Sequence, residues 1–128
     1  MDMTPLRRGF TLIELMVVMA IIAVLLTIAA PRYFNHLDRA REATLRQTLA
    51  VVRDAIDKFH GDTSSYPESI EELVTKRYLR ATPVDPITDS AKTWVLLPPP
   101  VANGSGRLWD LRSGAEGSGA NGTPYAEW

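Results

Sequence analysis

Apolar residues are concentrated near the start of the chain. The run Leu15–Ala30 has Thr27 as its only polar member. As an α-helix, residues 10–30 would extend about 32 Å, close to the thickness of the hydrocarbon layer of a bilayer. Arg7 and Arg8 come directly before this segment, and basic residues favour the cytoplasmic flank. The pattern predicts a single transmembrane helix whose N-terminal end is cytoplasmic.

Beyond Pro31 the apolar residues recur at helical spacing, as Phe34, Leu37, Leu45, Leu49, Val52, Ile56 and Phe59. One long helix is therefore predicted from about Phe10 to His60. Pro31 lacks a backbone donor and is expected to bend or loosen this helix. Gly61 is expected to end it. The apolar stripe after Pro31 predicts the face on which a small globular head packs.

The head is predicted to be a small α+β structure. A short second helix is expected to start in the segment 65–68, where a proline and an acidic residue fit a first turn. Pro83 and Pro86 predict an extended loop. Residues 93–97 and 107–111 favour two short antiparallel strands. Aromatic residues near the end, Tyr125 and Trp128, are expected to attach the glycine-rich tail to the head.

Composition and charge argue against several functions. The chain has 128 residues, 14 basic and 15 acidic side chains and a net charge of −1, so a nucleic-acid partner is not expected. It contains no cysteine, and His36 and His60 would lie about 36 Å apart on one helix. Residues 117–122 match a dinucleotide fingerprint in letters but lack the flanking strand and helix. No arrangement predicts an enzyme.

Glu14 is an ionisable residue inside the apolar segment, where a charge is costly unless it has a partner. A cut between Gly9 and Phe10 would create an amine one helical turn away, and a neighbouring subunit could supply one instead. An ordinary secretory signal peptide is the alternative. It is disfavoured because the apolar core of an ordinary signal peptide is shorter than the apolar run of this chain. In addition, the small residues Ala29 and Ala30, after which cleavage would fall, are followed directly by Pro31.

The segment 7–15, Arg-Arg-Gly-Phe-Thr-Leu-Ile-Glu-Leu, resembles the processing motif of type IV pilins and type II secretion pseudopilins. The resemblance implies that a prepilin peptidase cuts after Gly9 and methylates the Phe10 amine. The residues implied in processing are Arg8, Gly9, Phe10 and Thr11. It further implies that Glu14 sets the register of assembly and that Pro31 is the helix-distorting proline of the family.

The order of elements along the head is similar to the major-pseudopilin branch of this family. The resemblance implies a pilin-like fold with a cleaved cytoplasmic leader at 1–9, a transmembrane and filament-core helix at 10–30 and a periplasmic head at 31–128. The implied partners are further copies in a helical filament, other pseudopilins, the prepilin peptidase and an inner-membrane assembly platform. The implied location is the bacterial inner membrane, followed by a periplasmic filament that drives protein export.

Members of that branch often bind calcium in their last loop, and residues 110–117 are similar to the start of it. The candidate ligands here are Leu111, Ser113 and Glu116. Two aspartates of the family pattern are replaced by Gly122 and Pro124, which leaves fewer of the six to eight oxygens that calcium prefers. No cofactor is therefore predicted, and calcium stays an open alternative.

Two other functions remain open on the sequence. A type IV pilus subunit, serving adhesion, motility or DNA uptake, would carry the same processing motif. A membrane protein with one transmembrane helix and a ligand-binding head that does not polymerise would retain residues 1–9. The short head and the absence of cysteines around the C-terminal loop favour the secretion pseudopilin.

Overall fold

A computed structural model describes residues 9–100 and 104–128 of the chain. The chain divides into two compact units, one that ends at Leu37 and one that comprises Asp38–Trp128. The elements are α1 (Leu12–Thr63), α2 (Ile70–Thr75), β1 (Val95–Leu97), β2 (Asp110–Arg112) and a single 3₁₀ turn, η1 (Tyr125–Glu127). A long helix with a short helix and a two-stranded antiparallel sheet confirms the predicted α+β, pilin-like fold.

The long helix α1 begins two residues later and ends three residues later than predicted. The expectation that Gly61 ends the helix is wrong, because Gly61 continues in helical conformation. The helix ends at Thr63, because the next residue, Ser64, has a left-handed φ of 60°, and the Ser64 N–H donates to the carbonyl of His60 at 2.8 Å. The Thr63 hydroxyl also donates to the carbonyl of Phe59 at 2.8 Å. These two bonds satisfy carbonyls of the last turn in place of a glycine cap.

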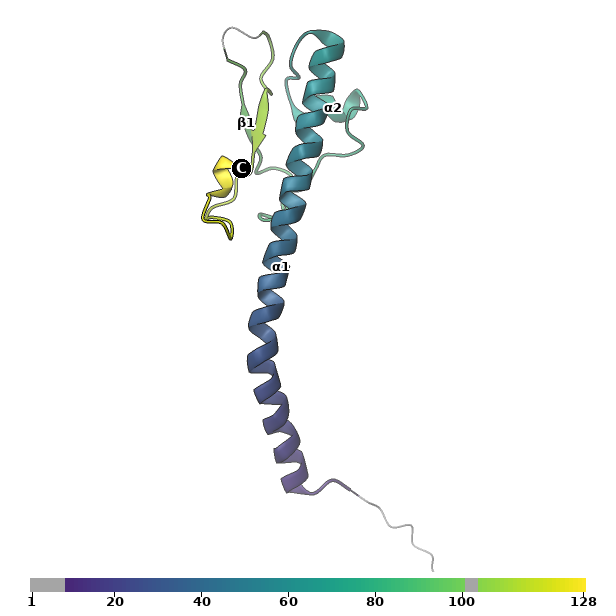
Figure 1. Cartoon of the computed structure of the whole chain (residues 1–128). Coiled ribbons are helices and arrows are strands. Elements are labelled where there is room, and N and C mark those ends of the chain that lie inside the picture. Colours follow the sequence, from purple (N-terminus) through teal and green to yellow (C-terminus); the bar gives the residue numbers. More distant parts are fainter. Residues whose placement is uncertain (1–8, 101–103) are drawn as a thin grey trace, which may run out of the picture. The chain divides into compact units, whose positions relative to one another are not determined.

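The core of the head forms on the predicted apolar stripe of α1. The buried apolar residues of α1 are Leu45, Leu49, Val52, Ala55, Ile56 and Phe59. They pack with Ile70, Leu73, Leu79, Trp94, Leu108 and Leu111. The three-and-four spacing places these α1 side chains on one face, which confirms the role predicted for the stripe from Leu45 to Phe59. The prediction is wrong for its first two members, because Phe34 is 60% exposed and neither Phe34 nor Leu37 joins the core. Figure 1 shows α2, β1 and the yellow C-terminal segment around the teal part of α1.

The short helix α2 starts later than the sequence indicated. Its N-cap is Ser69, with a φ of −157°, and the Ser69 hydroxyl accepts the Glu72 N–H at 3.2 Å. Pro67 lies before the helix because its carbonyl accepts the N–H groups of Arg107 and Leu108, at 3.2 and 2.9 Å. That use of the carbonyl excludes Pro67 from the first helical turn.

The predicted hairpin is present, but its first strand begins two residues later than predicted and its second strand is shorter and later. Val95 pairs with Arg112, Leu96 with Leu111 and Leu97 with Asp110 in antiparallel register. The interval 107–108, predicted as strand, donates its N–H groups to Pro67 rather than to β1. Hydrogen bonding with β1 therefore begins only at Trp109, whose N–H donates to the Leu97 carbonyl at 2.9 Å.

Gly106 is needed where the hairpin loop passes close to Tyr66. Its φ is +112°, and a Cβ there would overlap the Tyr66 carbonyl, whereas Gly104 has a similar φ of +116° and open space around it. We expect Gly106→Ala to cost more than about 3 kcal/mol and Gly104→Ala about 1–2 kcal/mol, since only the first adds overlap to backbone strain. Near-UV circular dichroism melting of the full chain in detergent measures this difference. Equal losses would show that the contact with Tyr66 is unimportant.

Candidate functional site

The predicted cleavage point lies just before α1. Gly9 and Phe10 are exposed and outside the helix, and Phe10 exposes 87% of its surface. A Cβ built on Gly9 would meet no atom within 4 Å. The predicted scissile bond thus joins two exposed residues with no tertiary contact at the first of them. Arg8, predicted to take part in processing, lies outside the described residues.

Thr11 and Glu14 form a reciprocal pair of hydrogen bonds at the start of α1. The Glu14 N–H donates to the Thr11 hydroxyl oxygen at 3.2 Å, and the Thr11 N–H donates to Glu14 Oε2 at 3.3 Å. This is a capping box, which satisfies two backbone donors that the first turn would leave unpaired. It also holds the Glu14 carboxylate near the positive end of the helix dipole. The Glu14 side chain is therefore directed back toward the predicted cleavage point.

The first part of α1 presents an apolar surface that no other described residue of the chain covers. It contains a window of mean hydropathy 2.8, of which 0% is buried, and is long and apolar enough to cross a membrane. The Thr27 hydroxyl, the polar group in this run, donates to the carbonyl of Val24 at 2.6 Å. Such internal pairing is what a side chain in lipid requires. Pro31 lies within α1, and the predicted bend there stays a prediction.

In the head, Arg53 of α1 joins the helix to the end of the chain. Its Nε donates to Asp110 Oδ1 at 2.8 Å. Its Nη2 donates to the carbonyl oxygen of Leu111 at 3.1 Å and to the main-chain oxygen of Trp128 at 2.7 Å. One guanidinium thus holds β2 and the residue at position 128 against the same turn of α1. Hydrogen bonds to a charged group are stronger than neutral ones.

Glu42 holds the same C-terminal segment from a point on α1 about three helical turns before Arg53. Its side chain is 8% exposed, and Oε1 accepts the Ala120 N–H at 2.9 Å and the Tyr125 hydroxyl at 3.0 Å. Burial, and then the hydrogen bond to Glu42, raises the pKa of Tyr125 above its ordinary value. The neutral phenol is therefore the form that the folded head holds.

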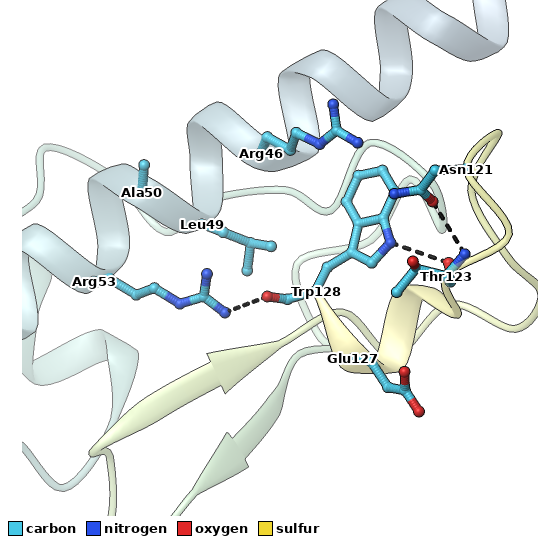
Figure 2. Close-up of a pocket in the computed structure, with 8 residues that line it drawn as sticks. All are labelled: Arg46, Leu49, Ala50, Arg53, Asn121, Thr123, Glu127 and Trp128. Atoms are coloured by element: carbon cyan, nitrogen blue, oxygen red, sulfur yellow. Dashed lines mark hydrogen bonds between the residues drawn. The ribbon is translucent and has the colours of Figure 1, made fainter.

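A shallow pocket of about 430 Å³ lies between α1 and the C-terminal segment. In Figure 2 the Trp128 indole lies beside Arg46, and Arg53 contacts the main chain of Trp128 instead; the guanidinium of Arg46 lies 4.6 Å from the indole centroid. The indole N–H donates to the carbonyl of Thr123 at 3.1 Å. These contacts confirm the prediction that Tyr125 and Trp128 attach the tail to the head.

Asp85 connects the proline-rich loop to the segment after β2. It is fully buried, and its carboxylate accepts the Ile87 N–H at 2.9 Å and the hydroxyl of Ser113. Ser113 is also fully buried, and its oxygen accepts the Ala115 N–H at 3.2 Å. The buried carboxylate therefore has hydrogen-bond donors on both oxygens, as burial of a charge requires.

Removing the Asp85 carboxylate should destabilise the head. Asp85→Ala leaves the Ile87 N–H and the Ser113 hydroxyl without a buried acceptor, and we expect a loss of about 3 kcal/mol. Asp57→Ala, at an exposed position of α1, is the control and should change stability by less than about 0.5 kcal/mol. Chemical unfolding followed by tryptophan fluorescence measures both. A loss no larger than that of the control would contradict the role given to Asp85.

The oxygens predicted to hold calcium already have other hydrogen-bond partners or are exposed. The Leu111 carbonyl accepts from Arg53, the Ser113 hydroxyl is bonded to Asp85, and Glu116 is exposed. Among the described residues, no cluster of three or more histidine, aspartate or glutamate side chains has the geometry to hold a metal ion. Calcium binding at these residues stays a prediction.

Sequence reasoning missed three residues that organise the head: Glu42, Arg53 and Asp85. Glu42 had a signal, because it occupies an apolar-stripe position three residues before Leu45. A carboxylate at such a position is buried only with a partner. Arg53 and Asp85 had no such signal, because their partners lie in segments distant in the sequence.

Comparisons with known proteins agree with this architecture. The Prokaryotic N-terminal methylation motif family matches residues 5–30. Type II secretion system core protein G of Pseudomonas aeruginosa is 30% identical over 96 residues, 62% of this chain and 68% of that protein. The corresponding protein of Klebsiella michiganensis is 29% identical over the same shares. Type IV major fimbrial protein FimA of Dichelobacter nodosus is 44% identical over 55 residues, 43% of this chain and 35% of FimA. No solved structure matches significantly.

The chain belongs to the family of type IV pilins and type II secretion pseudopilins. Proteins of this family are structural subunits rather than enzymes, and family membership implies filament assembly and processing by a prepilin peptidase. The apolar start of α1 is consistent with a pilin anchored in the inner membrane.

Proposed function

We infer that this chain is a subunit of the periplasmic pseudopilus of a type II secretion system. It is inserted in the inner membrane with its N-terminus in the cytoplasm, cut after Gly9 and methylated on Phe10. Residues 10–30 then pack with those of other copies to form the filament core, and the heads face outward. Growth of the filament drives protein export.

The observation that carries this proposal is the extent of the similarity to core protein G. It spans 62% of the chain, which is more than the part before Asp38 contains, so it includes part of the head, whereas the similarity to FimA spans 43%. The uncovered apolar surface of α1 supports the assembly step, because such a surface is stable in lipid or against other helices but not in water. The exposed bond between Gly9 and Phe10 supports the processing step.

Intact-mass spectrometry of the protein from membranes of its native host tests the processing step. We expect a mass that corresponds to a chain starting at Phe10 with one added methyl group. A full-length mass would instead favour a membrane protein that does not polymerise. A start near Pro31 would indicate a secreted head and would contradict the filament.

Deletion of the gene in that host separates the two filament types. A type II pseudopilin predicts that folded exoproteins accumulate in the periplasm while surface pili stay intact. Loss of surface pili, motility or DNA uptake with normal secretion would instead assign the chain to a type IV pilus, an alternative that the similarity to FimA supports. Complementation with the intact chain controls for effects on neighbouring genes.

A further inference from the structure

The guanidinium of Arg53 is surrounded by oxygen atoms from the part of the head that follows β1. These are a carboxylate oxygen of Asp110 and the main-chain oxygens of Leu111 and Trp128, at 2.8, 3.1 and 2.7 Å from its nitrogens. Carboxylate and carbonyl oxygens are also the ligands that a calcium ion prefers. Here these oxygens bind the Arg53 guanidinium, a cation that is part of the chain.

A calcium ion at this place would have to compete with Arg53. An ion bonded to the Leu111 carbonyl at about 2.4 Å would lie within about 6 Å of the Arg53 nitrogen that already donates to that oxygen. Two positive groups that close repel each other, and the guanidinium stays charged at every physiological pH. The Ser113 hydroxyl, the next predicted ligand, is buried and bonded to Asp85.

We propose that Arg53 is the fixed cation that positions residues 113–128, so the head keeps this C-terminal segment ordered without calcium. Glu42 and Arg46 hold the same segment through Ala120, Tyr125 and Trp128, so the attachment consists of side chains of α1. A covalently attached cation does not dissociate, and its effect is independent of metal concentration. The inference concerns the head alone and holds whichever filament the chain builds.

The first test compares the wild-type full chain in detergent with 1 mM calcium chloride and with a chelator. A native-state site saturated at a hundred times its dissociation constant would raise the melting temperature by about 10 °C. We expect no such difference, and we expect equal rates of cleavage by a glutamate-specific protease at Glu116 and Glu127. Stabilisation by calcium, or slower cleavage in calcium, would overturn the proposal without the use of any variant.

The second test replaces the cation. In Arg53→Met we expect cleavage at Glu116 and Glu127 to become about tenfold faster or more, in calcium and in chelator alike, because the open state of the segment gains population. Arg41→Met, an exposed arginine on the same helix, is the matched control and should behave as wild type. Arg53→Lys keeps the charge but cannot span three oxygens, and it should give an intermediate rate.

The position of the cuts separates positioning from general loss of stability. If Arg53 positions the C-terminal segment, mass spectrometry of the Arg53→Met digest will show faster cuts after residue 113 and little change at Glu71 and Glu72 in the first turn of α2. A uniform increase at all of these sites, or protection equal to that of wild type, would contradict the proposal. Should Arg53→Met fail to fold, the same comparison applies to Arg53→Lys.

Discussion

Glu14→Ala is expected to leave membrane insertion intact and to abolish filament assembly. Removal of a carboxylate from the apolar segment makes insertion easier, since a charge in lipid is costly. In a filament of packed helices, the Glu14 carboxylate is stable only where a neighbouring helix brings a positive group close to it. Its removal therefore takes away an interaction that fixes the register of one helix against the next. Alkaline extraction of membranes measures insertion. Chemical cross-linking through groups other than cysteine, together with electron microscopy, measures filament formation. Normal filaments from Glu14→Ala would refute the register role.

Thr11→Ala is the matched control for this experiment because Thr11 is the other half of the capping box. It removes a cap that contributes about 1 kcal/mol but retains the charge of Glu14. If Glu14 acts through its charge, Thr11→Ala should assemble far better than Glu14→Ala. Equal loss in the two variants would assign the effect to the helix start. The mass of each variant confirms that both were cut.

Gly9→Val is expected to block cleavage and therefore assembly. A peptidase must bring its catalytic groups to the Gly9 carbonyl, and a β-branched side chain beside that carbonyl obstructs the approach. The variant should not disturb the chain itself, because a Cβ at Gly9 meets no atom within 4 Å. Intact-mass spectrometry should show a chain that retains residues 1–9 and carries no methyl group on Phe10.

Gly61→Ala is the control for a glycine change as such. Its Cβ would also meet nothing within 4 Å, and Gly61 lies inside α1, far along the chain from the cleavage point. We expect normal processing and a gain in stability of about 0.5–1 kcal/mol, since alanine is the better helix residue. Efficient cleavage of Gly9→Val would contradict the proposed site of processing.

The long helix and its inner face could be predicted because both depend on local spacing. Leu45, Leu49 and Val52 follow helical periodicity, and no other part of the chain is needed to interpret that pattern. The processing motif is likewise local, so roles for Gly9 and Glu14 could be predicted from the sequence, and those roles stay predictions. The boundaries of the shorter elements were less accurate, because they depend on which distant group accepts each N–H.

The interval 107–108 illustrates this limit. Its residues favour a strand, but their N–H groups donate to the carbonyl of Pro67, forty residues earlier in the chain, and β2 begins only at Asp110. The oxygens assigned to calcium from the resemblance were local in sequence too. The cation that contacts the Leu111 carbonyl comes from α1, at a separation of 58 residues that no local pattern encodes.

The contacts of Arg53 also set the order in which the protein can mature. Its three acceptors lie 57, 58 and 75 residues later in the chain, so the helix turn that carries Arg53 is synthesised long before its partners. Closing such long intervals is slow compared with forming a helix. The apolar first part of α1 can therefore be complete while the rest of the chain is still an extended polypeptide. The head can close around Arg53 only after the segment that contains Trp128 has been synthesised.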